Sequence, residues 1–276
     1  MDFYTNVCRT RDKILVTGYQ GNKKQQLSVA YRPNHYVPSK KGDTAYRSLD
    51  GKPLEVVNLN SMGGARKFRE SYQGTTGFEI HGYDKYIYTY IADSFRGAIT
   101  IKPFRFMSQT FGIGPWDEKP ANVTYHECVD EAQLLTQFIK YWRKEKFDIV
   151  TGWNVDTFDM TYLCNRVDKL FDEGEHKKFS PWNMSDVREF RNQYGKMDMK
   201  FTLYGINILD YLDLYKKHTF VNQESYKLDH IAHVELDKKK LDYSEYGSLH
   251  KLYQQNYSRF LAYNVQDVVL VEDLED

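Results

Sequence analysis

The sequence predicts an α/β fold built in two parts. Up to about residue 96, short runs of alternating apolar and polar residues are separated by turn residues, which is typical of small strands. Beyond residue 97, short apolar runs alternate with segments of helical periodicity, which is typical of a sheet covered by helices. We therefore expect an α+β module in residues 1–97 and an α/β domain in residues 98–276.

The amino-terminal part is expected to be rich in strands. A polar, turn-rich stretch at residues 39–52 divides it, and residues 61–72 have helical spacing. Turn residues around Gly82 indicate one or two strands within residues 78–91. The remaining predicted strands are residues 3–7, 13–19, 26–31, 36–37 and 54–57.

In the second part we expect polar residues to gather at the carboxyl ends of the strands. Residues 129–145 form a clear amphipathic helix, and residues 148–152 read as a short buried strand that runs into the turn Trp153–Asn154. A strand pair turning at Pro103 should precede them, at residues 99–102 and 109–112. The remaining predicted elements are a helix at 160–171, a hairpin at 190–203 with its turn at 193–196, a strand at 207–215, and helices at 226–233 and 249–274.

The amino-acid composition excludes some classes of protein but does not identify a binding partner. Lys plus Arg equals Asp plus Glu at 38 each, so the net charge of zero argues against a general polyanion binder with a basic surface. Three scattered cysteines fit neither a disulfide framework nor a zinc site. No apolar run approaches the length of a membrane span, and we expect a soluble intracellular protein.

Two distant segments carry residues suited to phosphodiester chemistry. Asp159 ends a strand-to-helix turn, where we expect its carboxylate to be exposed. Tyr263 and Asp267 are spaced to lie on one face of a helix. Two carboxylates and a phenol brought together would hold a divalent cation and orient a water molecule. Each residue alone has an ordinary interpretation, as a helix cap or as part of a solvated face.

Four segments carry a recognisable pattern, at residues 151–160, 209–217, 222–231 and 263–267. In this order and spacing they resemble the proofreading domain of family B DNA polymerases, most closely those of T-even-like myophages, and a phage that infects cyanobacteria is one interpretation. The amino-terminal module is similar to the domain that precedes the exonuclease in those enzymes.

The resemblance implies a ribonuclease-H-like exonuclease domain and a role for each matching residue. Asp159 and Asp267 would bind Mg²⁺ or Mn²⁺, and Tyr263 would orient the attacking water. Asn154 and Phe158 would face the 3′ end of the DNA strand. The hairpin that carries Tyr194 would stack on bases or separate strands.

The first exonuclease motif of the family, Asp-x-Glu on the first strand of the nuclease sheet, is missing. Its place falls between Asp93 and residue 99, and the only Asp-x-Glu in the chain ends at Glu275. About half of the negative charge that two divalent cations need is therefore absent. Asp93, Asp156 or Asp210 could substitute, although each is better interpreted as a cap or a surface charge. We expect weak metal binding and an inactive or severely impaired nuclease.

Loss of a central strand also leaves structural alternatives open. There are three alternatives: a strand at residues 85–91 fills the gap, a second polypeptide supplies the missing strand, or the domain is poorly stable. The signature segments of nucleotide addition, Asp-x-x-Ser-Leu-Tyr-Pro and Asp-Thr-Asp, are also absent. We interpret the chain as part of a phage polymerase that binds single-stranded or primer 3′ ends.

The resemblance also implies partners and a location. A separate polypeptide would carry the palm, fingers and thumb, a sliding clamp would bind the full enzyme, and no membrane partner is implied. The place of action would be the cytoplasm of the infected host. The alternative function is a non-catalytic subunit of a split polymerase or an RNA-binding regulatory module, and an interrupted gene is a further possibility.

Overall fold

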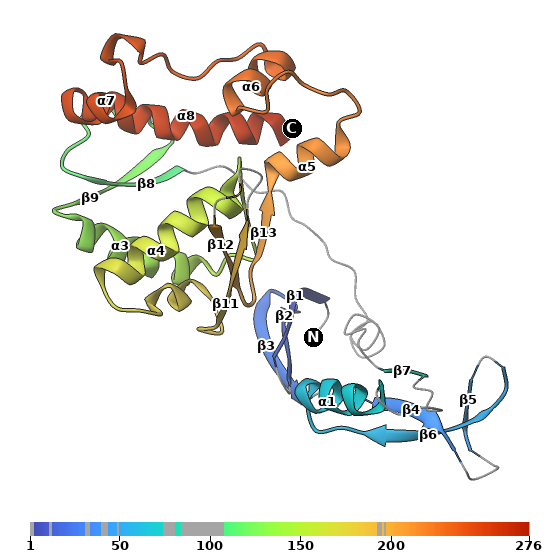
Figure 1. Cartoon of the computed structure of the whole chain (residues 1–276). Helices are drawn as coiled ribbons and strands as arrows, with labels where there is room; N and C mark the ends of the chain where they lie inside the picture. Colours follow the sequence, from blue (N-terminus) through green and yellow to red (C-terminus); the bar gives the residue numbers. More distant parts are fainter. Residues whose placement is uncertain are drawn as a thin grey trace. The chain divides into compact units, whose positions relative to one another are not determined.

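The computed structural model describes residues 3–10, 13–30, 34–39, 44–48, 50–73, 81–83, 108–191, 195 and 197–275. It divides into two compact units, residues 1–101 and 102–276 (Figure 1). The mixture of small sheets and helices is the α/β class that the sequence predicts. Among the described residues, no helix is both long and apolar enough to cross a membrane.

The first unit begins with an antiparallel three-stranded sheet in the order β1-β2-β3. The central strand is the core of this sheet, because Ile14, Leu15 and Val16 are almost completely buried. Gly21 closes the turn before β3 with a φ of 57°, a backbone conformation that glycine adopts without a steric cost. The strands are β1 (Phe3–Arg9), β2 (Lys13–Gln20) and β3 (Lys23–Ala30).

A second sheet in this unit has the order β5-β6-β4-β7. Buried His35 ties it to the helix, since its Nε2 lies 3.1 Å from the carbonyl oxygen of Ala65 and its ring stacks on Phe68. The elements are β4 (Asn34–Pro38), β5 (Tyr46–Arg47), β6 (Pro53–Asn58), α1 (Met62–Gln73) and β7 (His81–Tyr83). The two-residue strand β5 lies within the stretch of residues 39–52 that was predicted to be rich in turns.

The second unit contains a parallel pair that the sequence predicted only in part. Strand β8 (Ser108–Ile113) agrees with the predicted strand at 109–112, but it pairs with β9 (Val123–Cys128), which was not predicted. Its expected partner at residues 99–102 lies outside the described residues. Helix α8 (Tyr257–Glu275) lies on one side of this pair and α3 (Glu131–Glu145) on the other (Figure 1).

A second parallel pair positions the polar residues of this unit. Strand β10 (Ile149–Gly152) pairs with β13 (Asn207–Asp210), and the register sets Gly152 opposite Asp210. The carboxyl ends of both strands therefore meet at one edge of the sheet, where polar groups of α/β folds gather. The predicted strand at 207–215 is too long, because Asp210 caps α5 (Tyr211–His218) and starts a helix there.

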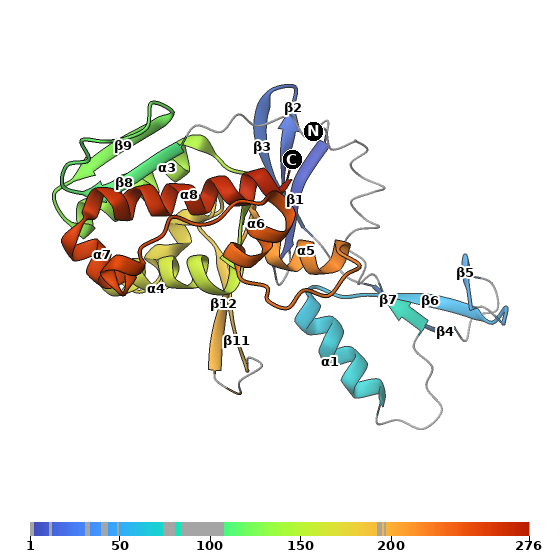
Figure 2. The same cartoon turned by 90° about the horizontal axis from the view of Figure 1, so that it is seen from above.

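Helices surround this pair and complete the core. A cluster centred on Trp142, Val167 and Phe201 joins α3 and α4 (Met160–Leu170) to the hairpin strand β12. The hairpin, which is longer than predicted, consists of β11 (Ser185–Arg191) and β12 (Met197–Leu203) and projects beyond α4 (Figure 2). The other elements are the π-helix η1 (Val155–Asp159), the 3₁₀ helices η2 (Glu175–Phe179) and η3 (Ser244–Tyr246), α6 (Leu228–Leu236) and α7 (Leu249–Gln255).

The carboxyl-terminal helical stretch, predicted as one helix at 249–274, is two helices. Helix α7 ends at Gln255, and α8 begins at Tyr257. Within the described residues, β8–β9 and β10–β13 are separate two-stranded sheets. The predicted loss of a central strand stays a prediction, because residues 84–107 are outside the described part of the chain.

Candidate active site

A tight turn after β10 carries the residues that the sequence associates with DNA. Asn154 has the left-handed φ of 63°, and the chain then forms the single-turn π-helix that ends at Asp159. A Cβ atom added to Gly152 would lie 3.1 Å from Cβ of Val155, so a larger residue at the start of this turn would require Val155 to shift by a few tenths of an ångström. Single π-turns of this kind are rare and frequently occur at functional sites.

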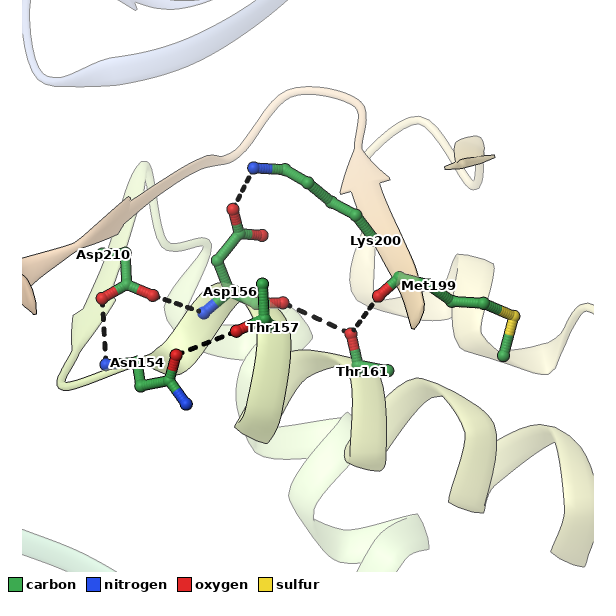
Figure 3. A network of polar contacts seen from close by, with 7 residues as sticks. All are labelled: Asn154, Asp156, Thr157, Thr161, Met199, Lys200 and Asp210. Atoms are coloured by element: carbon green, nitrogen blue, oxygen red, sulfur yellow. Dashed lines mark hydrogen bonds and ion pairs between the residues drawn. The ribbon is translucent and has the colours of Figure 1, made fainter. Parts of the chain in front are cut away.

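The carboxylate of Asp210 holds this turn (Figure 3). Its Oδ1 accepts hydrogen bonds from the backbone N–H of Asn154 at 2.9 Å and of Leu212 at 3.1 Å. Its Oδ2 accepts a hydrogen bond from the backbone N–H of Asp156 at 3.1 Å. Both oxygens of Asp210 therefore serve backbone donors, and the residue acts as a cap rather than as a substitute metal ligand.

The other side of the turn is bound to the hairpin. Lys200 of β12 forms an ion pair with buried Asp156, and Thr161 donates a hydrogen bond to the carbonyl of Met199 at 2.8 Å (Figure 3). The hydroxyl of Thr157 donates to Oδ1 of Asn154 at 2.8 Å. The amide of Asn154 thus has a fixed orientation, and Asp156 is held by Lys200.

Helix α8 brings a second set of polar groups to the site. Tyr263 is buried and Asp267 is half-buried, one turn further along the same helix. Lys240, from the segment between α6 and η3, lies with Nζ 2.7 Å from Oδ2 of Asp267 and 3.2 Å from the hydroxyl oxygen of Tyr263. The backbone N–H of Lys240 donates to Asp229 at 2.9 Å, which fixes the lysine to α6.

The carboxylates of Asp159 and Asp267 are close enough for their charges to interact. Desolvation raises the pKa of Asp159, and the negative charges of Asp210 and Asp267 raise it further. Desolvation also raises the pKa of Asp267, against the opposing effect of Lys240. A concentration of negative charge that is incompletely compensated is typical of sites that bind cations or transfer protons.

The donor atoms fit one hydrated divalent cation. Oδ1 of Asp267 is buried and has no hydrogen-bond partner among the described residues, so it is free to accept a ligand. No group of three His, Cys, Asp or Glu side chains suited to a metal ion occurs within the described part of the chain. Mg²⁺ is commonly bound through one or two carboxylates and several waters, whereas two adjacent cations need more acidic groups.

The predicted site residues that the structure describes lie at two places. The turn carries Asn154, Phe158 and Asp159, of which Phe158 is 67% exposed and Asp159 is also exposed. Tyr263 and Asp267 lie on α8 with Lys240 beside them. Tyr194 and Asp93 fall outside the described residues.

Sequence reasoning missed two residues that shape the site. Lys240 could be noticed only as part of the basic run of residues 238–240, which on its own is typical of a solvated surface. Lys200 gave no signal, because α4, η2 and β11 separate it from its partner Asp156. The interpretation of Asp210 as a cap is confirmed, but its hydrogen bonds to the turn after β10 could not be read from the sequence.

The fold and the charged residues define a class of nuclease domain, and comparison with known proteins agrees. Residues 98–231 match the family model of the DNA polymerase family B exonuclease domain. A DNA-directed DNA polymerase of Escherichia phage RB69 is 39% identical over 163 residues, which are 58% of this chain and 18% of that protein. The DNA-directed DNA polymerase of Enterobacteria phage T4 is 37% identical over 335 residues, which are 99% of this chain and 37% of that protein.

More distant relatives include the DNA polymerase catalytic subunit of Human herpesvirus 6A (strain Uganda-1102), 31% identical over 134 residues, 46% of this chain and 13% of that protein. The chain belongs to the family B DNA polymerases and contains their exonuclease domain, and it spans little more than a third of the length of the phage T4 relative, 37%. Exonuclease domains of this family generally depend on divalent metal ions. The matches do not favour the alternative of a non-catalytic subunit or an RNA-binding module.

Proposed function

We propose that this chain binds the 3′ end of single-stranded DNA at the site formed by the turn after β10 and by helix α8, and that it hydrolyses DNA poorly or not at all. The observation that carries the proposal is the approach of Asp159 and Asp267 from distant segments, with Lys240 paired to Asp267. The family match gives the substrate class, because the relatives are named DNA polymerases.

Binding of a DNA end is supported by the side chains that the turn offers. Phe158 is an exposed aromatic ring beside an oriented amide, that of Asn154, whose side-chain oxygen accepts a hydrogen bond from Thr157. A ring stacks on any base, and the amide can donate a hydrogen bond to the sugar or the base. Lys240 adds a positive charge for a phosphate. Tyr194 would add a further contact from the hairpin turn.

Impaired hydrolysis follows from the number of acidic groups. Asp159 and Asp267 would hold one hydrated Mg²⁺ or Mn²⁺, which supplies positive charge against the phosphate. Tyr263, with its hydroxyl beside Lys240, would orient a water molecule. The match to the phage T4 protein spans 335 residues against the 276 of this chain, so that protein has residues in this stretch with no counterpart here. This difference supports the loss of the first motif.

The proposal extends to partners. Nucleotide addition would need the palm, fingers and thumb from another polypeptide or from further residues of a longer protein, since the matched part is 37% of the phage T4 relative. A sliding clamp would act on the complete enzyme in the cytoplasm of the infected host.

A fluorescent oligonucleotide tests the binding directly. A single strand with 2-aminopurine at its 3′ terminus is titrated with the chain in EDTA, beside a strand with the same base in the middle. We expect a saturable change of fluorescence that is larger and occurs at lower protein concentration for the terminal probe. Phe158→Ala should weaken binding at least about fivefold, because base stacking on a ring contributes roughly 1–3 kcal/mol.

The matched control is Phe220→Ala, because Phe220 is a fully exposed phenylalanine outside the turn. Its replacement should leave the titration unchanged. Equal binding of the terminal and internal probes, or equal losses in the two variants, would show that the turn does not receive a 3′ end.

A further inference from the structure

We propose that Asp210 is a positioning residue, which holds the turn of residues 154–159 in the conformation that presents Asn154, Phe158 and Asp159 to a DNA end. The inference rests on the proposed function, because it assigns a role to Asp210 in forming that same site. Asp210 acts through the backbone of the turn, and all the contacts that carry this role lie within the second unit.

The geometry places Asp210 at the meeting point of three elements. It is the last residue of β13 and lies opposite Gly152 in the parallel ladder with β10. From there one carboxylate accepts backbone hydrogen bonds from the exit of β10, from the π-helix and from the first turn of α5. The residue is 9% exposed, so water competes little for these bonds.

The turn needs such an acceptor because its backbone is unfavourable by itself. Asn154 adopts a left-handed conformation, which is uncommon for residues other than glycine. The N–H groups of Asn154 and Asp156 lie at the start of a helical segment, where no earlier carbonyl is available to them. An ionised carboxylate accepts three hydrogen bonds readily, whereas an amide side chain offers only one oxygen.

Contacts on the opposite side show why the loss of Asp210 would affect the site selectively. Lys200 binds the side chain of Asp156, and Thr161 joins the start of α4 to β12, but neither contacts the backbone N–H of Asn154 or Asp156. Without Asp210, the first half of the turn would be free to relax while the fold persists through the core around Trp142. Asn154, at the start of the turn, would lose its fixed orientation first.

Two variants separate positioning from simple helix capping. Asp210→Asn keeps the shape of the side chain but removes one acceptor oxygen and the charge. Asp210→Ser keeps a good cap for α5 but is too short to serve Asn154 and Asp156 as well. The control is Asp168→Asn, because Asp168, in α4, is another carboxylate that accepts a backbone N–H, that of His176 at 2.8 Å, away from the turn.

Hydrogen exchange and DNA binding are measured on the same proteins, at a temperature where all are folded. We expect exchange of the amides of residues 154–159 to rise at least about tenfold in both Asp210 variants. Their affinity for the 3′-terminal 2-aminopurine strand should fall at least about tenfold. Asp168→Asn should leave both quantities unchanged at the turn.

Unchanged exchange at residues 154–159 in Asp210→Asn would overturn the inference. Wild-type behaviour of Asp210→Ser would do the same, since it would reduce Asp210 to a cap of α5. If the unmodified chain shows no preference for 3′ ends, the proposed function is wrong. The exchange measurement then still decides whether Asp210 holds the turn.

Discussion

The ammonium of Lys240 lies 2.7 Å from Oδ2 of Asp267, so that a carboxylate expected to bind a metal ion is paired with a cation of the protein itself. The side chain of Lys240 is 22% exposed, and it also donates a hydrogen bond to Tyr263. These contacts raise the pKa of Lys240 against the effect of its burial, which keeps the amine charged at neutral pH. A divalent cation that binds Asp267 must therefore compete with this lysine.

Replacing Lys240 by Met should tighten the binding of Mn²⁺. This change removes the repulsion between the charge of Lys240 and the bound cation, which is a few kcal/mol at most. Because solvent screens most of this repulsion at a partly exposed site, we expect the Mn²⁺ affinity to rise roughly fivefold. Titration of free Mn²⁺ by electron paramagnetic resonance measures the affinity without reference to hydrolysis.

The control for this change is Lys238→Met, since Lys238 forms a similar ion pair with Asp273 at 2.8 Å on the same segment. Its replacement should leave the Mn²⁺ affinity unchanged. Tightening in neither variant would show that Lys240 does not compete with the cation, and weaker binding in Lys240→Met would show that it supports the site.

The ion pair between Glu131 and Arg166 should make stability depend on pH. Hydrogen bonding to Arg166, together with its charge, lowers the pKa of Glu131 below its usual value. A lowered pKa in the folded state contributes stability above the usual pKa of a glutamate, and this contribution is lost as the pH falls through the lowered value. Because both side chains are about one-third exposed, we expect less than about 1 kcal/mol at pH 7.

Urea unfolding of the wild type, Glu131→Gln, Arg166→Gln and the double variant from pH 2.5 to 7 measures this contribution. The coupling free energy between the two positions should decline toward the acid end of this range. A coupling that is constant across the range would contradict an ionic origin.

A hydrogen-bond network around buried His176 should be important for the stability of the fold. Nδ1 of His176 lies 2.6 Å from Asp168, and Nε2 lies 2.7 Å from the hydroxyl oxygen of Ser185, which joins α4, η2 and β11. His176→Ala should reduce the free energy of unfolding by roughly 2–4 kcal/mol, because it creates a cavity and removes the ring partner of Oδ2 of Asp168. Exposed Lys177 is the control, and its replacement by Ala should change stability by less than about 0.5 kcal/mol.

The spacing of apolar residues was sufficient to predict the helices that bury one face against the core. The helix predicted at 129–145 is α3, with Leu135, Ile139 and Trp142 buried on one face. Periodicity could not predict where the strand ends and the helix begins at Asp210, because the Asp210 side chain caps α5 and accepts a backbone N–H from the turn after β10. The parallel partner β9 was missed because its residues do not alternate regularly between apolar and polar, and only Val123 and Cys128 at its two ends are buried.

The same distinction applies to the site. Asp159, Tyr263 and Asp267 were selected from the sequence by motif spacing, and their roles stay predictions. Lys240 could not be chosen as a site residue, because nothing in the sequence shows that its ammonium group contacts Asp267 on α8. The role of Lys200 likewise depends on its ion pair with Asp156, a contact that the sequence does not show.

Hydrolysis of a 5′-labelled single-stranded oligonucleotide by the purified chain, with Mg²⁺ or Mn²⁺, tests the account most directly. The control is the same chain carrying Asp159→Ala and Asp267→Ala, with folding of both proteins verified by circular dichroism. We predict no stepwise shortening beyond that of the control, while the unmodified chain still binds the 3′-terminal probe. Shortening that disappears in the control would contradict the account, because it would mean that Asp159 and Asp267 support catalysis without the first motif.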